Sequence, residues 1–116
     1  MWKGKRYILT KDAFEDLKAS GKMDKLQEFA KDEKVFMLGI VPQELEGKAK
    51  PATLKDKDRA AAKKLAKEMA ISLQDAEVII LAKSSKGVVI TDDVSLQKAC
   101  EATGVKFMTT KEVEGS

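Results

Sequence analysis

The chain has 116 residues, which is the size of one domain, so we expect a single domain over residues 1–116. It carries 22 Lys and Arg against 19 Asp and Glu, a net charge of +3, which is too small to argue by itself for wrapping nucleic acid. The chain contains no His, and this excludes imidazole catalysis and His-ligated zinc, so acid-base or metal chemistry must use carboxylates, Lys or Tyr.

Cysteine usage and apolar runs bear on the compartment. Cys100 is the single cysteine, which excludes an internal disulfide, and we expect it to be a small core residue. The longest strictly apolar run, residues 78–82, is far shorter than the ~20 residues of a membrane span. We therefore expect a cytoplasmic protein. Trp2, close to basic residues, is expected at a lightly packed terminus rather than on RNA.

The first third of the chain predicts two strands and two helices. Residues 6–10 form a β-branched and aromatic run that is typical of a strand, and residues 12–19 then show helical spacing up to Gly21. A second short helix is indicated around residues 26–30. Residues 35–41 are nearly all apolar, which favours a strand covered on both faces, as in a parallel sheet.

The next segment, residues 43–55, has weak periodicity and contains Gly47 and Pro51. We expect a loop there, with one helical turn around Glu44 and Leu45.

Two helices follow in direct succession. Residues 58–69 are rich in Ala and Lys and place their apolar side chains on one stripe, which predicts an amphipathic helix. Residues 72–75, Ser-Leu-Gln-Asp, fit a capping box and open a largely buried helix that ends at Ser84 or Ser85.

The last part of the chain predicts two further strands. Residues 87–90 form a short apolar strand, and the helix around residues 96–102 ends at Gly104. Residues 105–108 are expected to be the last strand and residues 109–116 a polar tail.

Strands that alternate with helices predict an α/β fold, a three-layer sandwich with a central parallel sheet. In such sheets ligands bind beyond the carboxyl ends of the strands, near the point where the strand order reverses. Polar residues that follow strands or open a buried helix are therefore the site candidates: Thr10, Asp12, Asp75, Asp92 and Asp93. Carboxylates that converge there could hold Mg²⁺, which activates water without any His.

Each acid also has a purely structural explanation. Asp75 occupies the third position of a capping box, and Asp92 and Asp93 stand where an Asx-turn or helix N-cap places an Asp. Asp12 could cap the first helix, and Glu44 could be a solvated loop charge. For any one acid alone, the structural explanation is the stronger one.

Taken in order, residues 71–82, residues 88–97, Ala99 and Gly104-Val105 resemble the carboxy-terminal half of a PIN domain. In that family a Ser-x-x-Asp opens a helix, a Thr-x-Asp follows the next strand, and a Leu and a small residue precede a Gly-Val. The doubled Asp resembles in particular the archaeal and eukaryotic PIN nucleases that mature small-subunit ribosomal RNA. The first half of the chain matches by layout only.

This resemblance implies a PIN-like fold with an acidic pocket and Mg²⁺- or Mn²⁺-dependent endonucleolytic cleavage of single-stranded RNA. It implies as partners a ribosomal RNA precursor or, as in toxin ribonucleases, an antitoxin-like protein. The catalytic acids would be Asp75, Asp93 with Asp92, and Glu44, which follows a Val-Pro as the family's mid-chain acid does; Thr91 would orient them. The metal ligands would be Asp12, Asp75, Asp92 and Asp93.

The sequence departs from the family at its first acid. Aligned on Ala13 and Phe14, Thr10 stands where the family has an Asp at the end of its first strand. Asp12, two residues later, is the candidate substitute. A PIN-like domain that has lost turnover and binds RNA or protein is therefore the alternative function, and a generic α/β binding domain whose acids are only caps is the third.

Overall fold

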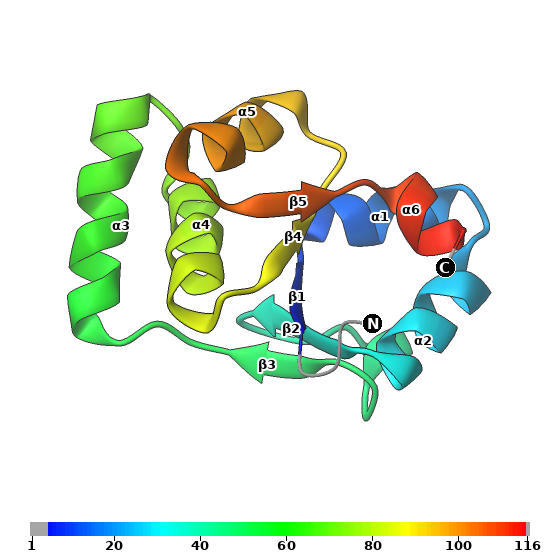
Figure 1. Ribbon diagram of the computed structural model, residues 1–116. Coiled ribbons are helices and arrows are strands. Elements are labelled where there is room, and N and C mark those ends of the chain that lie inside the picture. The colour runs from blue at the N-terminus through cyan, green and yellow to red at the C-terminus, as the bar shows by residue number, and fades with distance from the viewer. Residues whose placement is uncertain (1–4, 116) are drawn as a thin grey trace.

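A parallel sheet of five strands forms the centre of the computed structural model, which describes residues 5–115 (Figure 1). The strand order is β3-β2-β1-β4-β5, and every neighbouring pair is parallel. The strands are β1 (Arg6–Leu9), β2 (Lys34–Leu38), β3 (Lys50–Ala52), β4 (Val88–Ile90) and β5 (Lys106–Met108). Trp2 lies outside the described residues.

Helices cover both faces of this sheet, so the predicted three-layer α/β class is confirmed (Figure 1). The helices are α1 (Lys11–Ala19), α2 (Met23–Asp32), α3 (Asp56–Met69), α4 (Leu73–Ser85), α5 (Val94–Thr103) and α6 (Thr110–Glu114). A 3-10 turn, η1 (Gln43–Leu45), lies where one helical turn was expected.

Alternation along the strands separates two apolar layers. In β1, Tyr7 and Leu9 pack with α1, α2 and α6 on one face, whereas Ile8 packs with α4 and α5 on the other. Helix α4 is apolar over a wide arc because it contacts the sheet on one side and α3 on the other. Cys100 is buried in the second layer, as expected.

Two elements were missed by the sequence analysis. Strand β3 lies within the predicted loop at the edge of the sheet, with Lys50 and Pro51 exposed, so no apolar run marks it. Helix α6 lies within the predicted polar tail and is held by the buried side chains of Thr110 and Val113. Both elements depend on contacts with distant parts of the chain rather than on local pattern.

Other boundaries differ by a few residues. Strand β2 ends at Leu38 instead of continuing to residue 41, because Gly39 has a φ of +83° and turns the chain. Helix α3 begins at Asp56, two residues earlier than expected. No helix in residues 5–115 combines the length and apolarity that a membrane crossing needs.

Candidate active site

An acidic hollow of about 320 Å³ lies at the carboxyl edge of the sheet. Its carboxylates come from α1, from the first turn of α4 and from the residue before α5: Asp12, Glu15, Asp75 and Asp93. The chain leaves β1 toward β2 on one side and returns to β4 on the other, so the hollow stands where the strand order reverses.

Thr10 connects the ends of β1 and β4 and is buried. Its Oγ1 donates a hydrogen bond to the carbonyl oxygen of Ile90 at 2.7 Å and accepts one from the backbone N–H of Ala13 at 3.3 Å. The second bond makes Thr10 the N-cap of α1. Because both bonds serve the fold and the hydroxyl carries no charge, Thr10 is a structural residue at the rim of the hollow.

Thr91 links two of the predicted acids and is completely buried. Its Oγ1 donates to Oδ2 of Asp12 at 2.9 Å and accepts from the backbone N–H of Asp93 at 3.0 Å. The backbone N–H of Asp92 also points to Oδ2 of Asp12, at 3.4 Å. Residues that follow β1 and β4 are therefore held together by one hydroxyl.

Asp93 and Asp75 both lie at the start of a helix, as the capping explanation requires. Oδ1 of Asp93 accepts hydrogen bonds from the backbone N–H groups of Ser95 and Leu96, at 2.9 and 3.4 Å. Ser72 accepts one from the N–H of Asp75 at 3.1 Å, which confirms the serine half of the predicted capping box. Capping and a place in the hollow are thus compatible for these two acids.

Asp75 lines the hollow together with Asp12 and Asp93, and the charges of these two act on its pKa. Burial raises the pKa of Asp75, and the negative charges of Asp93 and Asp12 raise it further; a hydrogen bond from Ser72 acts in the opposite direction. A cation that enters the hollow would stabilise the charged form of Asp75.

Two of the predicted site acids lie elsewhere. Asp92 turns away and accepts hydrogen bonds from the backbone N–H and the Oγ1 of Thr110, at 2.9 and 2.6 Å, which anchors α6. Glu44 forms an ion pair with Lys18 at 2.8 Å, and the hydrogen bond from that Lys lowers the pKa of Glu44. Neither side chain lines the hollow.

Glu15 lines the hollow but was not among the predicted residues. It lies three residues after Asp12 on α1, a spacing that puts both carboxylates on one face of the helix. This spacing is the feature of the sequence from which Glu15 could have been predicted as a site residue.

The donor chemistry of the hollow suits a hard cation, because carboxylate oxygens are the protein ligands that Mg²⁺ prefers. In the described part of the chain, however, no three His, Cys, Asp or Glu side chains are grouped closely enough to hold a metal ion. Oδ2 of Asp12 and Oδ1 of Asp93 already accept hydrogen bonds. The residues therefore fit an ion held by one or two carboxylates, with water in the remaining positions.

We expect Thr91→Val to lower the free energy of unfolding by about 1–3 kcal/mol, because the change leaves the N–H of Asp93 without its acceptor and removes the shorter of the two hydrogen bonds to Asp12. Urea denaturation measures this. Thr103→Val is the matched control, since the Thr103 hydroxyl only adds a second bond to helix carbonyls of Ala99 and Cys100. Equal losses in the two variants would contradict a linking role for Thr91.

Comparison with known proteins gives a result for the fold only. No family model and no curated protein matches the sequence. Among solved structures, PAE2754 from Pyrobaculum aerophilum matches with a TM-score of 0.71 and 16% identity, over 97% of this chain and 88% of that one. SSO1118 from Sulfolobus solfataricus P2, described as a PilT N-terminus domain protein, matches with a TM-score of 0.64 and 12% identity, over 95% and 91% of the two chains.

The chain therefore has the fold of a PilT N-terminus (PIN) domain, as the resemblance of residues 71–105 implied. Identities this low show the fold alone. They assign no subfamily.

Proposed function

We propose that the protein is a Mg²⁺- or Mn²⁺-dependent endoribonuclease that cleaves single-stranded RNA at the acidic hollow. The observation that carries this proposal is the meeting of Asp12, Asp75 and Asp93 in one hollow, from three different places in the chain. The PIN-like fold and the family pattern around Asp75 and Asp93 support the same chemistry.

In this proposal Asp75 and Asp93 hold the ion and Asp12 adds negative charge beside it. The bound ion would polarise the scissile phosphate and lower the pKa of a water molecule. Glu15 stands at the rim to accept the proton of the attacking water, and Lys11, which also lines the hollow, neutralises a phosphate oxygen. Thr91 keeps Asp12 and the backbone of Asp93 in place.

Asp92 and Glu44 act from outside the hollow in this proposal. Asp92 anchors α6 through Thr110, and Glu44 holds η1 against α1 through Lys18. Both carboxylates would then affect cleavage through the fold around the site.

A second candidate function is a PIN-like module that binds RNA or an antitoxin-like protein without turnover. Thr10 favours it, because a neutral, fully hydrogen-bonded hydroxyl replaces the first acid of the family pattern. A ribosomal RNA precursor suits either function as the RNA.

The test is cleavage of a fluorescent single-stranded RNA of 20 nucleotides by purified protein. We expect cleavage in millimolar Mn²⁺ or Mg²⁺ and none in EDTA. Absence of cleavage with both ions, across RNAs of varied sequence, would exclude the nuclease and leave the binding module.

Divalent cations are also expected to stabilise the folded protein by binding only to it. For a millimolar Kd, a tenfold excess of ion adds about 1.4 kcal/mol, which raises Tm by several degrees. Asp93→Asn should remove this shift, because Asn caps α5 as well as Asp does but carries no charge. Thermal melts with and without Mn²⁺ measure it. An unchanged shift in that variant would place the ion elsewhere.

A further inference from the structure

The edge of the sheet opposite the acidic hollow is basic. Four of the five strands begin with a cation: Arg6 in β1, Lys34 in β2, Lys50 in β3 and Lys106 in β5. The remaining strand, β4, has Lys86 two residues before its first residue. Since the strands are parallel, these residues lie along one edge, which we call the basic edge.

Two hollows of about 370 Å³ each lie on the basic edge, one on either side of β1. The first is lined by five cations and one acid, Glu33; the cations are Arg6, Lys31, Lys34, Lys48 and Lys50. Among the residues that the structure describes, the second is lined by four cations and no acid; the cations are Lys5, Lys83, Lys86 and Lys106. Cations therefore dominate both hollows.

Helix dipoles explain only part of this charge. Lys31 and Lys83 lie in the last turns of α2 and α4, where a cation complements the carbonyl end of a helix. Arg6 and Lys34, in contrast, are direct partners in the register of β1 and β2, and like charges in such a pair destabilise a sheet. The pair of Arg6 and Lys34 thus works against local stability.

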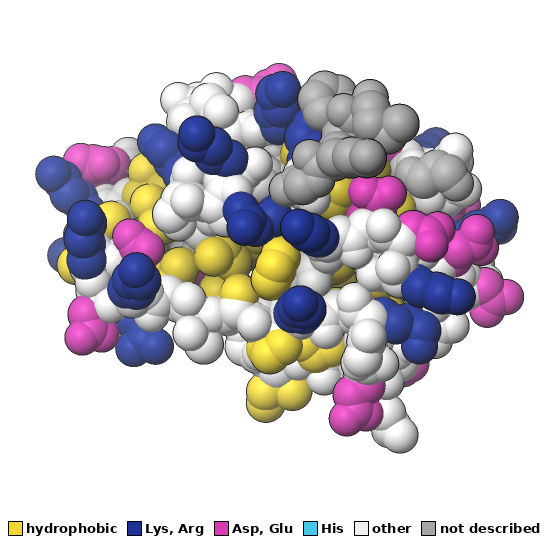
Figure 2. Space-filling view, turned by 60° about the horizontal axis from the view of Figure 1, so that its bottom comes forward, with side chains coloured by type: hydrophobic (Ala, Val, Ile, Leu, Met, Phe, Trp, Pro, Cys, Tyr) yellow, Lys and Arg dark blue, Asp and Glu magenta, His cyan; other side chains and the backbone are white. Residues whose placement is uncertain are grey.

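Within residues 5–115, none of Lys34, Lys48 and Lys50 forms an ion pair with a carboxylate, and all three are exposed. These amines are available to an anion from solution. Lys and Arg side chains also surround an apolar area on the face that Figure 2 turns forward.

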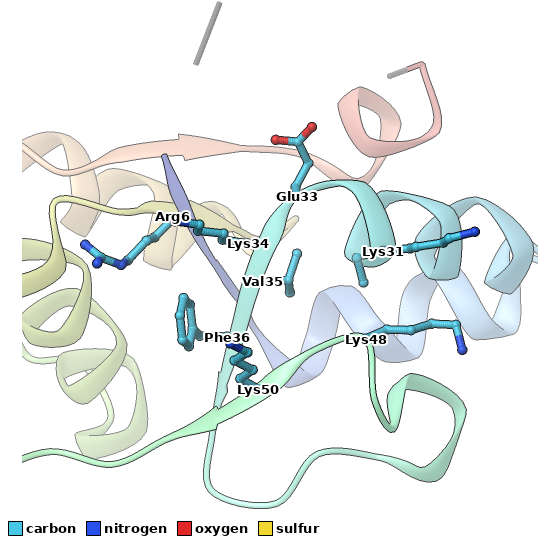
Figure 3. A pocket seen from close by; sticks show the side chains of 9 residues that line it. Arg6, Lys31, Glu33, Lys34, Val35, Phe36, Lys48 and Lys50 are labelled. Atoms are coloured by element: carbon cyan, nitrogen blue, oxygen red, sulfur yellow. The ribbon is translucent and has the colours of Figure 1, made fainter. Parts of the chain in front are cut away.

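The cations of the first hollow spread apart instead of converging. Figure 3 shows Lys31 and Lys48 extending to one side and Arg6 to the other, with the half-buried ring of Phe36 on the side of Arg6. A spread of charges suits an extended chain of phosphates better than one small anion. Cations and an aromatic ring that line one hollow are also a combination that binds single-stranded nucleic acid.

We propose that the basic edge binds the phosphate backbone of single-stranded RNA, as a second contact remote from the acidic hollow. The choice of RNA as the polyanion rests on the proposed function. Four carboxylates and one lysine line the acidic hollow, so in the absence of divalent ions we expect affinity for RNA to come from another surface. The strands have three to five residues, so the sheet measures only about 10–17 Å along its strands, from the basic edge to the end where the acidic hollow lies.

The experiment measures binding of a fluorescent 20-nucleotide oligo-uridine in EDTA, where no metal-dependent cleavage takes place. The test variant combines Lys34→Gln, Lys48→Gln and Lys50→Gln. We expect its Kd to rise on the order of 100-fold at 0.1 M salt, and the slope of log K against log salt to fall by about 2, because each phosphate contact contributes about 0.7. Its Tm should stay the same or rise, since repulsion is removed.

The matched control combines Lys57→Gln, Lys63→Gln and Lys64→Gln on α3, which makes the same change in net charge on exposed residues outside both hollows. We expect its Kd to change less than about threefold. Equal losses in both variants, or no loss in the first, would overturn the proposal. So would polyglutamate of matched charge binding as tightly as the RNA, since the surface would then suit an acidic protein.

Failure of the proposed function has a different signature. If the chain binds RNA at the basic edge but never cleaves it, the nuclease proposal fails alone. If it cleaves RNA and the first triple variant leaves both Kd and KM unchanged, the basic edge fails alone.

Discussion

Asp75→Asn is expected to abolish Mn²⁺-dependent RNA cleavage and, in the absence of divalent ions, to stabilise the protein at neutral pH. Activity should fall at least about 100-fold, because a site with few protein ligands loses one of its charged donors. Stability should rise because the change removes a carboxylate that burial and the charges of Asp93 and Asp12 destabilise.

The pH dependence follows from the direction of the pKa shift. The folded state raises the pKa of Asp75 above its value of 3.8, so the unfolded chain loses this proton first. The contribution of Asp75 to the free energy of unfolding therefore falls as pH rises from 3.8 to the raised pKa of the folded state. Above that pKa the full destabilisation is present. The gain in Tm of Asp75→Asn should be largest near pH 7 and vanish near pH 3.

Asp56→Asn is the matched control for this prediction. Asp56 also lies in the first turn of a helix, α3, but it is exposed and does not line the hollow. We expect full cleavage in this variant and a small loss of stability, since it removes only a favourable interaction with the helix dipole. A gain in stability there, or undiminished cleavage by Asp75→Asn, would contradict the role given to Asp75.

Thr10→Asp is expected to tighten Mn²⁺ binding and raise cleavage about tenfold or more, at a cost in stability. The new carboxylate adds a charge at the position where the PIN pattern has its first acid, on the rim of the hollow. It can still accept the hydrogen bond from Ala13, but it cannot donate to the carbonyl of Ile90 as Thr10 does at 2.7 Å. We expect a loss of about 1–3 kcal/mol without metal.

Mn²⁺ should recover part of that loss, since the ion binds the folded state more tightly in this variant. Thr10→Asn is the control, because its amide can both cap α1 and donate to Ile90 but brings no charge. Calorimetric titration with Mn²⁺ and the RNA assay measure the comparison. If the Asn variant matches the Asp variant in metal affinity and cleavage, charge at this position is irrelevant.

The two ends of the parallel strands carry opposite charge. Carboxylates gather where β1 and β4 end, and cations gather where the strands begin. In the proposed nuclease the acidic hollow would act on one phosphate through the bound ion and Lys11, whereas the lysines of the basic edge would attract other phosphates of the RNA.

The sequence by itself determined the α/β class and the order of most elements. Continuous apolar runs such as Val88–Ile90 require cover on both faces, and local caps such as Ser72 start helices from neighbouring backbone groups alone. It also placed Asp12, Asp75 and Asp93 at element ends, which in a parallel sheet lie at one edge.

Tertiary structure decided which polar groups share a surface. Asp92 and Asp93 are adjacent in sequence, yet one anchors α6 through Thr110 and the other lines the hollow. The pairing of β3 with β2 and the packing of α6 depend on residues far away in the sequence, so no local pattern predicts them. Which surface such a side chain lines depends on packing between distant segments, and spacing along the chain does not predict it.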